Sequence, residues 1–104
     1  MAKTAFLITL DYQRAIRNAN SLDTIAADIL KYRGNLNDNA AKCNRDWKGD
    51  NAIVFTNKER RVSDNLEQIA ANIRNTAETI RRVAKRTYDA EMRTLEIARN
   101  RSYR

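Results

Sequence analysis

Few side chains in this sequence are suited to acid–base or nucleophilic chemistry. Its 104 residues include no histidine and a single cysteine, Cys43, so the commonest general base and metal ligand is missing. The sequence contains no nucleophile–base arrangement, no cysteine pair and no glycine-rich phosphate loop. The neighbouring acids Asp89 and Glu91 would point to different faces of a helix. We therefore expect a protein that is not an enzyme and needs no cofactor and no metal.

Basic side chains offer a second kind of chemistry, which is contact with a negatively charged partner. The formal net charge is +7, and residues 81–104 carry eight basic and three acidic groups, a net charge of +5. Four basic residues share one broad helical face: Arg81, Arg82, Lys85 and Arg86. This face could simply be solvated, it could contact an acidic partner protein, or it could neutralise phosphates in a small basic coiled-coil protein that binds nucleic acid. Three acidic groups interrupt the basic run and no recognition motif accompanies it, so we do not expect nucleic acid to be the partner.

The elements that must position these groups are two long helices. The sequence has no proline and only two glycines, and its first half repeats apolar residues in alternating steps of three and four. This pattern predicts a helix over about residues 10–47. The stripe consists of Ala15, Ala19, Leu22, Ala26, Ile29, Arg33, Leu36, Ala40, Cys43 and Trp47. Residues 1–8 are expected to be extended, with Thr9 or Asp11 as the helix cap.

Two residues at the middle of this helix weaken the pattern. Arg33 lies on the apolar stripe, and Gly34 costs about 1 kcal/mol relative to alanine inside a helix. Because Ile29, Leu36 and Cys43 keep their register across the glycine, we predict a continuous helix that tolerates a kink. Arg33 is expected to extend to solvent or to meet an acidic group, and Cys43 is expected to be a buried thiol.

A second helix is predicted over about residues 51–97, followed by a frayed tail over 98–104. Its apolar stripe consists of Phe55, Glu59, Val62, Leu66, Ile69, Ile73, Thr76, Ile80, Val83, Thr87 and Ala90. Ala70, Ala77 and Ala84 flank this stripe. Two ion pairs with i,i+4 spacing are expected along the helix, Glu78–Arg82 and Asp89–Arg93.

The segment Trp47-Lys48-Gly49 separates the two periodic regions. A glycine can supply the left-handed residue that ends a helix, and Asp50 is a suitable N-cap for the helix that follows. The sequence therefore predicts a turn over 48–50 and an antiparallel two-helix hairpin. In this hairpin the ring of Trp47 would cover the open end between the helices.

Helical patterning throughout a chain of this length, with Trp47-x-Gly49 at its midpoint, resembles the WXG100 (ESAT-6-like) family of type VII secretion substrates. Ala40 and Ala41 before the tryptophan, Ala52 and Phe55 after the glycine, and the opening segment 8–12 (Ile-Thr-Leu-Asp-Tyr) agree with this resemblance. It implies a helical hairpin that is a substrate, co-secreted partner or targeting chaperone of a type VII system in a Gram-positive bacterium. One subclass of the family pairs with the N-terminal helical domain of a larger toxin.

Burial predicts a dimer independently of the resemblance. Two helices packed side by side bury one stripe each. Further apolar residues beside each stripe would stay exposed to water, and a hairpin of this size has too small a core to be stable alone. An antiparallel four-helix bundle made from two hairpins would cover it. The residues expected at this pairing interface are Leu22, Ile25, Ile29, Leu36, Phe55, Val62, Leu66, Ile69, Ile73 and Ile80. Both a homodimer and a heterodimer with a related hairpin fit this pattern.

The route of export follows from the resemblance as well. The family's export signal is Tyr-x-x-x-Asp/Glu, whereas here Tyr88 is followed by Asp89 and Glu91, and the fourth position is Met92. Tyr88 could be an aromatic residue at the end of the core, or these residues could form a degenerate signal that a partner complements. The apolar run over residues 5–10 is too short for a cleavable signal peptide and no stretch is long enough to span a membrane. The sequence thus predicts a cytoplasmic protein that is secreted without a cleaved leader.

Overall fold

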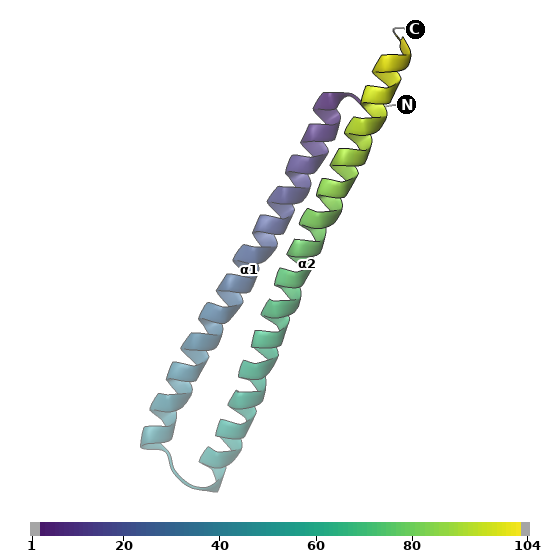
Figure 1. Ribbon diagram of the computed structural model, residues 1–104. Coiled ribbons are helices and arrows are strands. Elements are labelled where there is room, and N and C mark those ends of the chain that lie inside the picture. Colours follow the sequence, from purple (N-terminus) through teal and green to yellow (C-terminus); the bar gives the residue numbers. More distant parts are fainter. Residues whose placement is uncertain (1–2, 103–104) are drawn as a thin grey trace. The chain divides into compact units, whose positions relative to one another are not determined.

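Two long α-helices make up the described part of the chain. The computed structural model describes residues 3–102, and within this range it contains no strand. Helix α1 spans Ala5–Asp46 and helix α2 spans Asp50–Ser102, with residues 47–49 between them (Figure 1). The all-helical class predicted from the periodicity is confirmed, and α1 continues without a break through Gly34.

Both helices are longer than the sequence predicted. Helix α1 begins at Ala5 and not near residue 10, because Thr4 caps it: the Leu7 N–H donates to Thr4 Oγ1 at 3.2 Å. The extended lead-in and the caps at Thr9 and Asp11 were therefore wrong. Helix α2 continues past residue 97 to Ser102, and residues 103–104 of the expected frayed tail lie outside the described residues. Unbroken helix-forming residues and the absence of proline explain this extension.

The connection between the helices is three residues long. The Trp47 N–H still donates to the Cys43 carbonyl at 2.8 Å, although α1 ends at Asp46. Gly49 has a φ of +114°, a backbone conformation that glycine adopts readily. Its carbonyl accepts from the Ile53 N–H at 3.2 Å, so Gly49, and not Asp50, occupies the N-cap position of α2. Asp50 lies in the first turn, where its charge complements the helix dipole.

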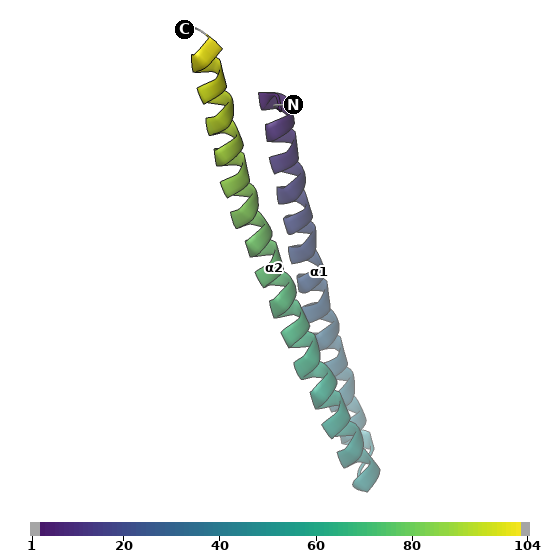
Figure 2. The same ribbon diagram turned by 90° about the vertical axis from the view of Figure 1, so that its right-hand side faces the viewer.

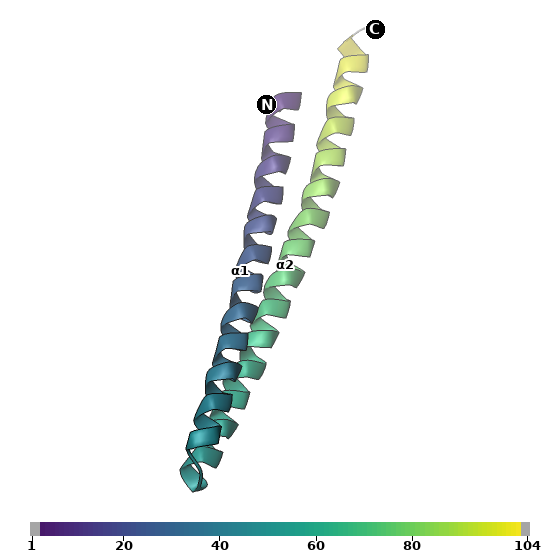
Figure 3. The ribbon, with the colours of Figure 1, turned by 90° about the vertical axis from the view of Figure 1, so that its left-hand side faces the viewer.

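The chain divides into two compact units. One holds Met1–Leu22 and Asn75–Arg104 and is called the terminal unit here; the other holds Asp23–Arg74 and is called the turn unit. In the turn unit the end of α1 and the start of α2 form a helical hairpin around the connection (Figure 1). In the terminal unit the start of α1 lies beside the last part of α2, whose final turns continue past it (Figures 2 and 3).

Small side chains form the contact between the helices in both units. The buried residues of the turn unit are Ala26, Ala40, Ala52, Ser63 and Ala70, and those of the terminal unit are Ile8, Ala19 and Ala77. Most of them recur at seven-residue spacing along each helix, which is the repeat that keeps one stripe facing a neighbouring helix. We call the positions in register with Ala19 on α1 and Ala70 on α2 the seam. Small seam residues allow two helices to pack closely.

The seam differs from the stripe predicted for the second helix. Ser63 and Ala70 are buried at 5% and 1% exposure, whereas Val62 and Ile69 are 48% and 46% exposed. The residues predicted to flank the stripe therefore make the contact, because close packing of backbones favours the smallest side chains. The larger apolar residues lie beside the seam, and no large side chain is fully buried among the described residues. Cys43, three positions after a seam alanine, is exposed and not buried as predicted.

Candidate functional site

The turn unit carries the motif Trp47-x-Gly49 at its closed end. The Trp47 ring lies 5.8 Å from the Phe55 ring, centroid to centroid, at an interplanar angle of 51°. On the same unit Thr56 Oγ1 donates to Asn44 Oδ1 at 2.9 Å and links the two helices. Trp47 nevertheless remains 44% exposed, and it borders a shallow hollow of about 320 Å³ with Ile53 and Thr56. The indole thus rests on Phe55 with one face free for a partner.

An apolar face lies to one side of the seam in the turn unit. Residues three positions after a seam residue or one position before it project to the same side of both antiparallel helices. In the turn unit these positions hold Ile25, Ile29, Tyr32, Leu36, Asn39, Cys43, Phe55, Glu59, Val62, Leu66, Ile69 and Ile73. They include eight of the ten residues predicted for a pairing interface. Tyr32 is 69% exposed and Ile25 47% exposed in the single chain.

One carboxylate interrupts this apolar face. Glu59 is half-buried, and its Oε1 atom is shielded from solvent without a hydrogen-bond partner among the described residues. A shielded acceptor without a donor is unfavourable in a finished structure.

The terminal unit carries the same face in a more open form. Its apolar positions include Ile8, Ala15, Leu22, Ile80 and Val83, so the other two predicted interface residues also lie here, and polar residues occupy other positions of the face, among them Asp11, Asn18, Thr76 and Thr87. A groove of about 360 Å³ opens on this face between α1 and α2, lined mainly by apolar side chains. Tyr12 occupies a seam position seven residues before Ala19, and its ring lies 5.1 Å from that of Tyr88. A bulky pair at the seam in place of alanines accounts for the open groove.

The three residues suggested from the sequence as a degenerate export signal are all engaged within the terminal unit. Tyr88 packs against Tyr12, and Lys85 Nζ lies 5.8 Å from the centroid of the Tyr88 ring. Asp89 accepts a hydrogen bond from Lys85 at 3.0 Å, and this contact raises the pKa of Lys85. Pairing of Asp89 with Lys85 replaces the predicted Asp89–Arg93 pair. Likewise Glu78 pairs with Arg81 and not with Arg82 as predicted.

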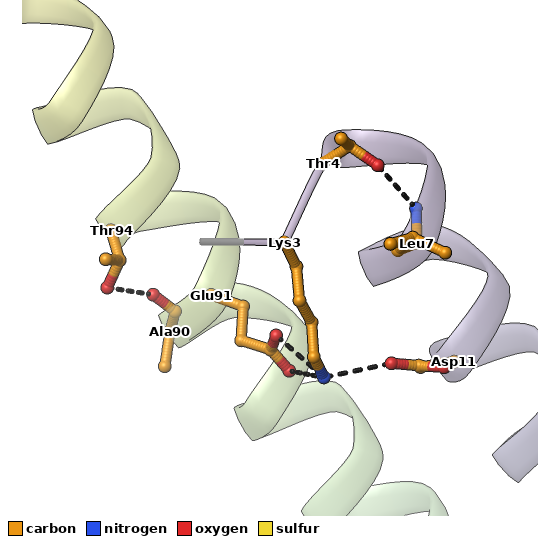
Figure 4. Close-up of polar contacts among 7 residues, drawn as sticks. All are labelled: Lys3, Thr4, Leu7, Asp11, Ala90, Glu91 and Thr94. Carbon is orange, nitrogen blue, oxygen red and sulfur yellow. Dashed lines mark hydrogen bonds and ion pairs between the residues drawn. The ribbon is translucent and has the colours of Figure 1, made fainter. Parts of the chain in front are cut away.

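Glu91, the third of these residues, belongs to a cluster that the sequence did not predict (Figure 4). Lys3 Nζ lies between Asp11 Oδ2 of α1, at 2.9 Å, and Glu91 Oε2 of α2, at 3.1 Å. The hydrogen bonds to Asp11 and then to Glu91 raise the pKa of Lys3. The cluster thereby links the segment before α1 to both helices. A lysine eight residues before an aspartate gave no sequence signal, because the partner on α2 is 88 residues away.

Arg33 is a second residue whose role depends on the pairing of the helices. It occupies a seam position, and its Nε donates both to the carbonyl oxygen of Ser63, at 3.0 Å, and to Ser63 Oγ, at 2.9 Å. Its Nη2 reaches Glu67 Oε2 at 3.2 Å, so the predicted acidic contact is present. Ser63 was missed, although it stands seven residues before Ala70, and that spacing could have revealed it.

The four basic residues suggested as an acidic-partner contact do not form one free surface. Arg81 is bonded to Glu78 and to Asn20 Oδ1, the latter at 2.9 Å. Lys85 is bonded to Asp89. Arg82 and Arg86 are exposed and, being four residues apart, lie on the same side of α2.

Comparison with protein-family models, curated proteins and solved structures finds no match for this chain. The structure itself defines the class as an all-helical protein built from two long helices. Among the described residues no cluster of histidine, cysteine and acidic side chains is suited to a metal ion. Neither helix, over the residues described, is apolar enough along a sufficient length to cross a bilayer.

Proposed function

We propose that this chain is a WXG100-like helical hairpin that serves a type VII secretion system of a Gram-positive bacterium. It would act without enzymatic activity, as a secreted substrate or as a co-secreted partner and targeting chaperone of a larger toxin. It would pair with a second helical hairpin or with the helical N-terminal domain of that toxin. Folding would take place in the cytoplasm and export would need no cleaved signal peptide.

The exposed apolar face is the observation that carries this proposal. In each unit the seam buries mostly alanines, while the isoleucines, leucines and valines beside it, except the buried Ile8, remain half-buried or exposed. Apolar area removed from water is worth about 25 cal/mol per Å², so leaving this face wet forfeits the largest part of the available stabilisation. Contiguous apolar surface of this kind is typical of proteins that complete their core with a partner.

The connection between the helices supports the family part of the proposal. Trp47 and Gly49 lie in the three-residue segment that reverses the chain, and Gly49 has the positive φ that favours glycine at that position. Trp47 rests on Phe55 yet keeps almost half of its surface exposed. An exposed indole at the closed end of a hairpin is suited to contact with a partner or with the export machinery.

The engagement of the tyrosine region supports a partner-dependent form of export. Tyr88, Asp89 and Glu91 contact Tyr12, Lys85 and Lys3 within the terminal unit. A receptor that read these three side chains would have to displace those contacts. We therefore propose that the partner supplies the main signal and that this chain complements it.

Secretion tests the proposed function directly. We would compare extracellular and cellular amounts of wild type, Trp47→Ala and Phe6→Ala in strains with and without the secretion ATPase, together with the partner candidates encoded nearby. Phe6 is the matched control, because it is an aromatic residue that is more exposed than Trp47, at 72% against 44%, and lies away from the apolar face. We expect ATPase-dependent export of wild type and Phe6→Ala, and a severalfold loss for Trp47→Ala. Export that does not depend on the ATPase would remove the proposal.

A further inference from the structure

The border of the apolar face carries a charge pattern that identifies its partner further. Positions two residues after each seam residue lie along the outer edge of this face on both helices; we call them the rim. The charged residues of the rim are Arg14, Asp28, Lys42, Lys58, Arg86 and Arg93. All six are exposed, and none of them makes an ion pair or a side-chain hydrogen bond within the described residues.

Each unit has a basic rim when it is considered by itself. In the terminal unit the rim carries Arg14, Arg86 and Arg93 and no acid, a charge of +3. In the turn unit Lys42 and Lys58 outweigh Asp28, a charge of +1. Elsewhere in the chain Lys3, Arg33 and Lys85 are each paired with an acid within their own unit.

We infer that the apolar face docks a different helical protein with acidic side chains along the border of its own apolar face, and not a second copy of this chain. This inference rests on the proposed function, because it assumes that the face is an interface. A second copy would bring a rim of the same sign against either unit, and like charges beside a helical interface are unfavourable. An acidic rim would meet unpaired arginines and lysines, which favours fast and selective association.

The two acidic groups on the face itself do not favour self-pairing. Asp11 is already held by Lys3. Glu59 presents one shielded oxygen without a donor, and by helical register it lies among apolar residues and not beside the basic rim. A second copy therefore offers Glu59 and the rim residue Asp28 against a border of five basic side chains. The proposed partner would instead carry mostly acidic side chains along the border of its apolar face.

The inference is tested with a copy of this chain whose rim is reversed. The variant R14E/K42E/K58E/R86E/R93E changes the formal net charge from +7 to −3. Its matched control, R17E/K31E/R61E/R82E/R99E, has the same net charge but alters five exposed residues away from the apolar face. Circular dichroism first establishes that each variant is helical. Dye-labelled wild type is then titrated with unlabelled wild type, reversed-rim copy or control, and the dissociation constants are measured at several salt concentrations.

We expect wild type to bind the reversed-rim copy at least about tenfold more tightly than it binds itself, with the difference shrinking as salt screens the charges. The control should stay within about threefold of wild-type self-association, because exposed charges away from an interface contribute little. Self-association of wild type as tight as the mixed pair would overturn the inference and make a second copy the occupant, while the proposed function would stand. Equal gains for variant and control would overturn it as well. The absence of any association at high concentration would remove both the inference and the interface on which the proposed function depends.

Discussion

The turn unit and the terminal unit have the same seam positions, but different residues occupy these positions in the two units. The turn unit closes its seam with alanines and one polar contact, Arg33 to Ser63. The terminal unit places Tyr12 at a seam position and leaves a groove of about 360 Å³ beside it. Their charges differ too, because residues 23–74 carry nine basic and eight acidic groups whereas residues 1–22 and 75–104 carry eleven and five. Close packing thus accompanies charge balance in one unit, and an open face accompanies a basic excess in the other.

This difference shows that the residues that hold the two helices together are distinct from those beside the seam. Small residues at every seventh position hold α1 and α2 together and need no large core. Bulky apolar residues placed beside that seam are then available for a second molecule. The terminal unit, which is more open and more basic, is accordingly the better candidate for the first contact with an acidic partner, because charge accelerates encounter.

Enlarging a buried seam residue should give the largest difference in stability between the two units. Ala26 is fully buried in the turn unit, so Ala26→Leu has no space and should lower the free energy of unfolding by about 1–3 kcal/mol. Ala84 lines the groove of the terminal unit, so Ala84→Leu can occupy it and should leave stability within about 1 kcal/mol of wild type or raise it. Urea unfolding followed by circular dichroism measures both.

Ala27→Leu is the matched control for this pair of variants, since Ala27 is exposed next to Ala26. Its unfolding midpoint should stay close to that of wild type. Similar losses for Ala26→Leu and Ala84→Leu would show that the two units are packed equally tightly and would contradict the contrast drawn between them.

The polar contact in the turn unit provides a second, smaller test. Arg33→Ala and Ser63→Ala should each cost about 1 kcal/mol, because each leaves a partly buried partner without its hydrogen bond. The double variant places alanine at both seam positions, as elsewhere in the unit, and should recover most of that loss. A double-mutant cycle by urea unfolding gives the coupling energy. Additive losses would mean that Arg33 acts through Glu67 alone and not through the seam.

Much of the fold could be predicted from periodicity, whereas the residues through which the two helices contact each other could not. The apolar repeat established two long helices, and Gly49 was recognised as the break between them. The stripe of α2 was misassigned because Val62 and Ile69 are more hydrophobic than Ser63 and Ala70, and hydrophobicity alone does not reveal that close backbone approach favours small residues. Cys43 was misplaced for the same reason, since it shares the stripe but not the seam.

The candidate site shows the same division between local and long-range information. The residues of the apolar face could be grouped from the sequence, because a face is a local property of one helix, and their role in pairing stays a prediction. Ion pairs were predicted from spacing alone, and this prediction was wrong for two acids: Asp89 pairs with Lys85, and Glu78 pairs with Arg81. The Lys3 cluster and the Tyr12–Tyr88 contact join residues more than 70 positions apart, and no pattern within one helix encodes such a pairing.

The smallest expected effect concerns Lys3, which the terminal unit has and for which the turn unit has no counterpart. Bonds to Asp11 and Glu91 raise the pKa of Lys3 above its ordinary value of 10.5, so the charged form is favoured in the folded chain. A raised pKa contributes stability that is fully present below 10.5 and is lost as pH rises through the higher folded value. Lys3→Met should therefore lower the urea midpoint slightly at neutral pH and match wild type well above pH 10.5.

Lys85→Met is the control for this measurement, because Lys85 bonds to Asp89 within α2 and does not join the two helices. Both variants remove one positive charge. A difference between them at neutral pH therefore reports the link from Lys3 to α2. It should appear as faster amide exchange over the first turns of α1 in Lys3→Met and not in Lys85→Met, since only the former frees that helix end. Equal exchange in the two variants would show that the start of α1 is held by Thr4 and Ile8 without the lysine.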